Sequence, residues 1–146
     1  MTPLTYLGAY LFLPATWKMV EYDTDRSVWM AFVSVAVGLW GGLMIGYITE
    51  YYTSYAYNPT QEVARACETG AATNIIYGLA LGYLSCIIPV LVLAVASYVS
   101  HKLLGMYGIG LSALGMLSTL AVGLTIDAYG PISDNAGGIA EMAGLG

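Results

Sequence analysis

The segment from Asp127 to Met142 holds the residues of this chain best suited to chemistry. It reads DAYGPISDNAGGIAEM and follows directly on a long apolar run. Asp127 and Asp134 are seven residues apart, so on a continuous helix they lie on one face, two turns apart. Pro131 can kink such a helix. This places Asp134 near the water boundary and Asp127 deeper in the apolar region.

Carboxylates at such depth are costly, and their default interpretation is functional. Asp134 stands beside Asn135 and two glycines, a setting that suits oxygen ligation of Mg²⁺. The alternative is a capped turn in which Asp134 is the N-cap of a helix that begins at Asn135. Both interpretations stay open at this point. One carboxylate cannot hold a metal alone, so we expect further ligands from other helices.

Glu50 is a second candidate, because it closes an apolar run in the sequence TEYYTS. It is either an acid of the membrane interface or part of a site. The chain has no nucleotide-binding glycine motif, no His–Cys metal spacing and no Ser-His-Asp set. Cys67 and Cys86 fit no framework and indicate reduced structural thiols. No catalytic residue is therefore assigned within this chain.

The composition is that of a membrane protein. Of the 146 residues, 58% are hydrophobic and 9% are charged, and the mean hydropathy is +0.72. A soluble domain carries roughly 25% charged residues. A net charge of −5 with four scattered basic residues argues against nucleic acid, because no basic patch can neutralise phosphates.

Uncharged stretches at 27–49, 69–100 and 103–126 are each long enough to cross a bilayer as a helix. We expect an all-α, multi-pass transmembrane bundle whose members include spanning helices at 28–52, 73–101 and 106–134. Residues 1–20, with an apolar run and Pro14, indicate the end of a fourth helix. Residues 1–146 are therefore expected to be a fragment of a larger domain. The partial helix at the start and the missing metal ligands favour this interpretation, and the start shows no convincing signal peptide.

The connectors and small residues add detail to this bundle. Residues 53–72 form a polar loop, in which Thr60–Cys67 is expected to form a short helix with Thr60 as N-cap. His101-Lys102 marks a tight connection. The spacings Gly38-x3-Gly42-x3-Gly46 and Gly78-x3-Gly82 predict close helix packing. The positive-inside rule places the 53–72 loop outside the cytosol, because this loop has fewer basic residues than the connections on the opposite side. The rule rests here on only a few charged residues.

Three segments together resemble the membrane-bound, ion-translocating inorganic pyrophosphatases. They are DAYGPISDNAGGIAEM at 127–142, GYITEYYTS at 46–54 and TGAATN at 69–74, with GLALGY at 78–83 in support. They occur in the order and spacing of that family. The resemblance is strong over residues 35–146 and looser over the first 34, and the sixteen-residue segment is highly specific.

The resemblance implies a homodimer with sixteen spanning helices per subunit, which couples hydrolysis of Mg²⁺-diphosphate to transport of H⁺ or Na⁺. Carried over by position, Asp134 is a Mg²⁺-diphosphate ligand, and Asp127 is a carboxylate of the ion-coupling region. Glu50 matches a signature glutamate and is a weaker coupling candidate. The resemblance also places the 53–72 loop in the cytosol, against the charge count.

Cofactors and location follow from the same resemblance. Mg²⁺ is expected, and a dependence on K⁺ is left open because the deciding position lies beyond Gly146. The partners are pyrophosphate, the pumped ion, membrane lipid and a second subunit. The membrane is vacuolar or that of an acidic organelle in a eukaryote, and the plasma membrane in a prokaryote. The competing hypothesis is a small non-enzymatic membrane module, such as a channel or assembly subunit.

Overall fold

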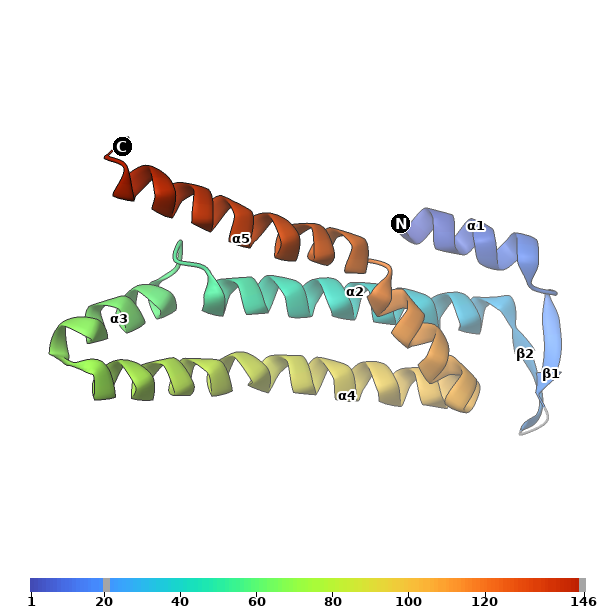
Figure 1. Ribbon diagram of the computed structural model, residues 1–146. Coiled ribbons are helices and arrows are strands. Elements are labelled where there is room, and N and C mark those ends of the chain that lie inside the picture. The colour runs from blue at the N-terminus through green and yellow to red at the C-terminus, as the bar shows by residue number, and fades with distance from the viewer. Residues whose placement is uncertain (20–21, 145–146) are drawn as a thin grey trace.

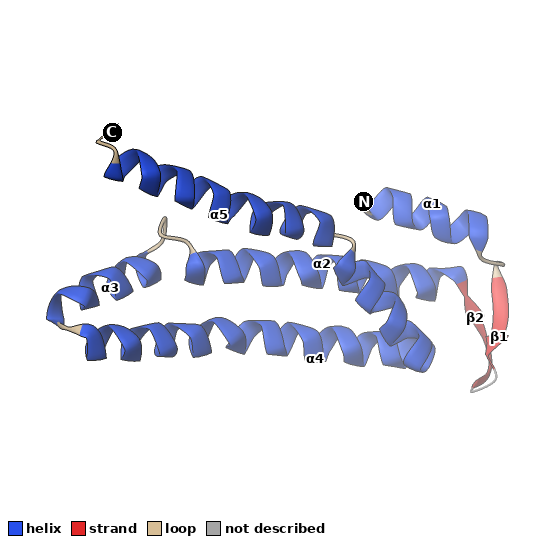
Figure 2. Ribbon diagram, viewed as in Figure 1, coloured by secondary structure: helices blue, strands red, loops and turns tan. Residues whose placement is uncertain are grey.

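The computed structural model describes residues 1–19 and 22–144, and within them the side chains of 19, 22–24, 126 and 127 are left undescribed. The chain is largely helical, as Figures 1 and 2 show. The elements in order are α1 (Thr2–Phe12), β1 (Thr16–Met19), β2 (Tyr22–Ser27), α2 (Val28–Thr53), α3 (Asn58–Ala66), the 3-10 turn η1 (Cys67–Thr69), α4 (Ala71–Leu117) and α5 (Leu120–Met142).

Residues 1–19 do not form one helix end: the chain is mostly helical as expected, but it also contains a two-stranded sheet. Helix α1 stops at Phe12, and Leu13 is extended because Pro14 disfavours a helical conformation in the residue before it. Strands β1 and β2 then pair as an antiparallel hairpin. Aromatic and β-branched residues in these strands favour extended backbone, and Lys18 stands opposite Asp25 in the register, a favourable cross-strand charge pair.

Helix α2 covers the expected helix at 28–52, and it begins where charged residues end. The 53–72 segment is less of a loop than expected, because it contains α3 and η1. Helix α3 begins two residues earlier than predicted, with Tyr57 at the N-cap position and proline in its first turn, as Pro59 favours. Thr60 is therefore no cap. Its hydroxyl instead donates to the Tyr52 carbonyl at 3.2 Å, which ties α3 to the end of α2.

Helix α4 contains a reversal that divides it into a first arm (71–103) and a second arm (106–117). Leu104 (φ −140°, ψ 20°) and Gly105 (φ +58°, ψ −144°) leave the helical conformation, and Gly105 supplies the positive φ that other residues avoid. The connection expected at His101-Lys102 thus lies slightly later. The expected helix at 106–134 is broken at Ser118–Thr119 into the second arm and α5.

The second arm packs tightly on α2 through small residues. A Cβ on Gly38 would meet the Ser112 backbone, and one on Gly42 would lie 3.3 Å from the Met116 Cα. Gly115 approaches the Val35 backbone in the same way. The predicted packing role of Gly38 and Gly42 is confirmed, and the partner is the second arm.

The other predicted glycines have no such role among the described residues. A Cβ at Gly46, Gly78 or Gly82 would meet nothing within 4 Å. Gly78 and Gly82 instead line a cavity of about 260 Å³ between the first arm and α3.

Most of the apolar helix surface points outward. Two helical stretches, Val28–Thr69 and Ala71–Met142, are long and apolar enough to cross a membrane. In the most apolar 18-residue segment of the first stretch, only 28% is buried within the chain. In the corresponding segment of the second stretch, only 6% is buried. Apolar surface of this extent needs lipid or further protein to cover it, which fits a membrane protein.

Candidate functional site on helix α5

Helix α5 positions both aspartates of the predicted site. Its backbone is helical from Leu120 to Met142 and continues through Pro131. Asp127 and Asp134 therefore share one face, separated along the axis by about 10 Å at 1.5 Å per residue. Because proline has no N–H, Pro131 also deprives the Asp127 carbonyl of its usual helical donor. The side chain of Asp127 lies outside the described part of the structure.

The capped-turn interpretation of Asp134 is wrong. A helix N-cap has non-helical backbone and precedes the first helical residue, but Asp134 lies in the middle of α5, and no helix begins at Asn135. The reason is that Gly130 and Pro131 do not break this helix. Asp134 is exposed, so its carboxylate is available to a partner outside the described residues.

Metal binding needs more ligands than this helix offers. Within the described ranges, no three His, Cys, Asp or Glu side chains come together as a metal site. The single carboxylate of Asp134 still fits Mg²⁺ chemically, because Mg²⁺ is commonly bound through one or two carboxylates, with substrate phosphates and water as the other ligands. Asp134 would hold the ion together with groups from outside this chain.

Glu50 lies three residues before Thr53, the last residue of α2, and is exposed. Its carbonyl accepts the Ser54 amide at 2.8 Å, which closes the helix. The tyrosines that follow form a cluster, with the Tyr51 ring 5.2 Å from that of Tyr52 and 5.1 Å from that of Tyr57. The segment 46–54 therefore contains the end of α2 and, through Tyr51, contacts the start of α3 at Tyr57.

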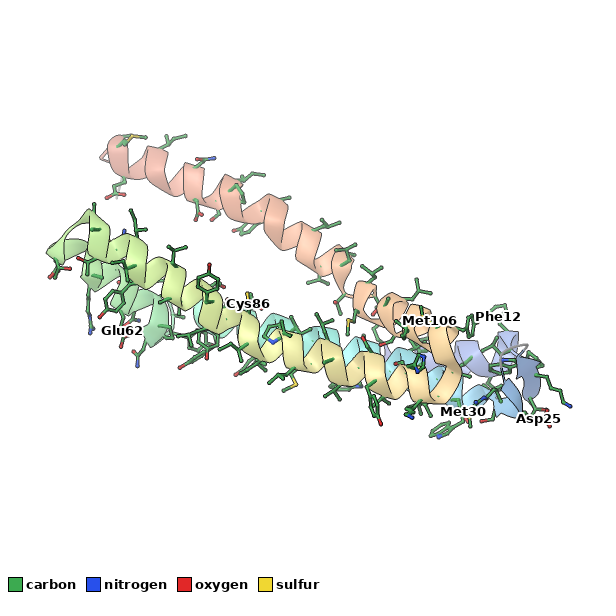
Figure 3. The ribbon with its side chains drawn as sticks, turned by 90° about the horizontal axis from the view of Figure 1, so that it is seen from below. Phe12, Asp25, Met30, Glu62, Cys86 and Met106 are labelled. Carbon is green, nitrogen blue, oxygen red and sulfur yellow. The ribbon has the colours of Figure 1, made fainter. Side chains whose placement is uncertain are left out.

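The structure does not bring Glu50 and the α5 aspartates into one packed site. Helix α5 has no extensive contact with any other element in the described chain. The C-terminal end of α5 does lie toward the same end of the molecule as α3 and the end of α2 (Figure 1). The opposite end carries the β-hairpin and Met106, as Figure 3 shows.

Glu141 is a candidate that the sequence analysis missed. It follows Asp134 by seven residues, so it extends the spacing of Asp127 and Asp134 along the same face, and it is exposed. Glycines recur with the same spacing at 123, 130, 137 and 144. The face thus alternates glycine and acid at steps of four and three residues. The seven-residue spacing of Asp127 and Asp134, continued by one more step, indicates Glu141.

Comparison with known proteins agrees with the resemblance of the three segments. The family described as inorganic H⁺ pyrophosphatase matches residues 1–146. A putative K⁺-stimulated pyrophosphate-energized sodium pump of Bacteroides thetaiotaomicron is 47% identical over 97% of this chain and 21% of its own length. The K⁺-stimulated sodium pump of Thermotoga maritima is 44% identical over 77% of the chain and 15% of the pump.

A K⁺-insensitive pyrophosphate-energized proton pump of Caldanaerobacter subterraneus subsp. tengcongensis is 45% identical over 70% of this chain and 16% of its own length. The chain therefore spans about a fifth or less of the curated relatives it matches. The family match over the full chain and these identities lead to one conclusion: this chain belongs to the inorganic H⁺ pyrophosphatase family.

Proposed function

We propose that this chain is a segment of a membrane-bound pyrophosphatase that couples hydrolysis of Mg²⁺-diphosphate to transport of H⁺ or Na⁺. The observation that carries the proposal is the signature 127–142 on an exposed apolar helix, in a chain whose relatives are pyrophosphate-energized pumps. The relatives named above are all pyrophosphate-energized pumps, which disfavours the competing hypothesis of a small non-enzymatic membrane module. The ion stays H⁺ or Na⁺, because relatives of 44% and 45% identity pump Na⁺ and H⁺ respectively.

The proposed topology has three membrane crossings. They are α2, the first arm of α4, and the second arm of α4 together with α5, which correspond to the predicted spans at 28–52, 73–101 and 106–134. Helix α1 belongs to a further crossing. The outward apolar surface would contact lipid and the other helices of a sixteen-helix subunit, and two subunits would form a homodimer.

The proposed chemistry assigns separate tasks to the two aspartates. When bound, Mg²⁺ would neutralise the charge of the diphosphate and would lower the pKa of a water nucleophile. Asp134 orients the metal–diphosphate complex through its carboxylate. Asp127, two turns further into the membrane, lies where a carboxylate can take part in ion movement. We assign Glu50 as a second, weaker candidate for a carboxylate that takes part in ion coupling. K⁺ is a candidate additional cofactor, because some of the relatives are K⁺-stimulated.

Replacement of Asp134 tests this assignment in the full-length protein. Asp134→Asn keeps the shape but removes one negative charge from a site with several cations, so hydrolysis should fall by about 100-fold or more. Ser133→Ala, which removes a neighbouring hydroxyl, is the matched control and should keep most activity. The measurement is Mg²⁺-dependent release of phosphate in membranes with equal protein levels. Near-normal hydrolysis by Asp134→Asn would remove the ligand role.

A further inference from the structure

Pro131 interrupts the hydrogen bonding of α5 without interrupting the helix. The backbone stays helical from Leu120 to Met142, and Figure 1 shows α5 as one continuous helix. Because proline has no N–H, the carbonyl four residues earlier, that of Asp127, lacks its helical donor. A carbonyl without a donor is costly in an apolar environment. The Asp127 carbonyl therefore needs a hydrogen-bond donor or a cation from elsewhere.

The nearby side chains of α5 cannot supply this donor. In these helices a serine or threonine hydroxyl donates to a carbonyl three or four residues back, as the Thr125 hydroxyl does to the Ala121 carbonyl at 2.8 Å. The positions that could serve the Asp127 carbonyl in this way are 130 and 131, and they hold glycine and proline. In membrane proteins, carbonyls freed by proline are satisfied by ordered water or neighbouring helices, and free carbonyls of transporters coordinate the transported cation.

The turn at Gly130–Pro131 leaves the Asp127 carbonyl accessible and brings a carboxylate toward it. A helical side chain leans toward the N-terminus and covers the turn before its own Cα. A side chain at position 130 would therefore cover the Asp127 carbonyl, and glycine leaves it uncovered. By the same rule the Asp134 side chain leans toward this turn, whereas the carbonyl of Asp127 points along the helix toward its C-terminus. Two oxygen groups thus approach the turn from opposite directions.

We propose that the Gly130–Pro131 turn is an oxygen site on the ion path, where the Asp127 carbonyl binds a cation, either Na⁺ or a protonated water. Pro131 is a positioning residue, because it keeps the carbonyl free without touching the ion. The site lies between Asp134, the proposed metal ligand, and the deeper carboxylate of Asp127, so it would connect hydrolysis with ion movement. This inference rests on the proposed function, because it needs α5 to line the ion path.

Two replacements of Pro131 in the full-length protein separate the missing N–H from the proline ring. Pro131→Ala restores the N–H, which can then donate to the Asp127 carbonyl. Lactic acid, introduced at position 131 in response to a stop codon, removes the ring but forms an ester without an N–H, so the carbonyl stays free. Pro89→Ala is the matched control, because it restores an N–H inside α4, and residues 70–126 contain no acidic side chain.

Phosphate release and ion uptake are measured together in sealed vesicles. We expect Pro131→Ala to lower the number of ions moved per pyrophosphate at least about twofold, because the carbonyl is no longer free to bind the ion. The lactic acid variant and Pro89→Ala should keep the ratio of the unmodified protein. An unchanged ratio in Pro131→Ala overturns the inference alone, as does an equal loss in the lactic acid variant. An unmodified protein that splits no pyrophosphate, or moves no ion, overturns the proposed function as well.

A structure of the unmodified full-length protein that resolves water tests the site without any variant. We expect a water molecule or cation within about 3.2 Å of the Asp127 carbonyl oxygen. Density that disappears when choline replaces Na⁺ identifies Na⁺, and density that persists identifies water; both results support the site. A donor side chain of another helix on this carbonyl, or contact with lipid alone, would overturn it.

Discussion

Hydroxyl and carboxylate side chains meet the apolar environment of these helices in different ways. Ser34, Thr49 and Thr53 each donate to a carbonyl four residues back, at 2.8–2.9 Å, so their polar atoms are satisfied within one helix. An aspartate has no donor to offer when ionised, and it needs a cation, a donor or water. This is why Asp127 and Asp134 indicate function, whereas the hydroxyls indicate helix structure.

Asp127→Asn should separate transport from hydrolysis. Because Asp127 lies about 10 Å from Asp134 along α5, the substitution leaves the proposed metal ligand in place. We expect hydrolysis within about tenfold of the unmodified enzyme but fewer ions moved per pyrophosphate, since a membrane carboxylate has been removed. Phosphate release and ion uptake are measured together in sealed vesicles. A loss of hydrolysis as severe as that of Asp134→Asn would contradict the division of tasks.

At the scale of elements, close backbone contact holds α2 to the second arm of α4. Ser34 of α2 and Ser112 of the second arm are almost fully buried, at 0% and 3% exposure, and glycines beside them bring the two backbones together. Small residues at such contacts let van der Waals packing drive association, which apolar surface alone does not do in lipid. This contact fixes the second arm on α2.

Alanine substitutions of two glycines on α2 test this contact. Gly38→Ala places a Cβ against the Ser112 backbone, so it should destabilise the protein by about 1–3 kcal/mol. Gly46→Ala has open space, and it should be neutral or stabilise by up to about 1 kcal/mol, since alanine favours helix. The midpoints of thermal unfolding in detergent are compared. Equal midpoints for the two variants would show that the contact does not form.

At the scale of the whole molecule, the chain carries the proposed ligand Asp134 on a largely uncovered apolar surface. Asp134 is exposed, the described residues supply no metal cluster, and α5 lacks extensive packing within the described chain. These features agree with a chain that spans about a fifth of its most similar relatives. The rest of the site would come from helices outside this chain.

The purified 146-residue chain should therefore show no Mg²⁺-dependent hydrolysis of pyrophosphate. One carboxylate on one helix cannot bind the several cations that phosphoryl transfer requires. Release of phosphate is measured in detergent and in lipid, with the full-length protein as the positive control. Turnover by the isolated chain that Asp134→Asn abolishes would show that the chain builds a complete site by itself.

The two ends of the molecule should face opposite sides of the membrane. Cys67 lies at the α3 end and is exposed, and the β-hairpin lies at the other end (Figure 1). We expect an impermeant maleimide to label Cys67 from the cytosolic side, in line with the signature segments and against the positive-inside rule. Lys18→Cys in a Cys67→Ser background should label from the opposite side. The reverse pattern would favour the charge count.

The sequence by itself determined the class of this protein and its main candidate site. Uncharged runs predict long apolar helices because only internally bonded backbone tolerates lipid, and the seven-residue spacing of Asp127 and Asp134 fixes their common face on any continuous helix. The sixteen-residue signature identifies the family. The apolar helices, the common face of the aspartates and the family signature do not depend on which helices contact one another. The order of residues along the chain was therefore enough to predict them.

Tertiary structure decided the features that depend on contact between distant residues. The pattern of α2 glycines predicts close packing, but only the fold shows that Gly38 and Gly42 meet Ser112 and Met116. Local signals were also ambiguous: Pro131 could end a helix or lie within one, and α5 continues through it. The reversal at Leu104–Gly105, where Leu104 is fully buried, depends on the packing around it, because glycine permits such a turn without requiring it.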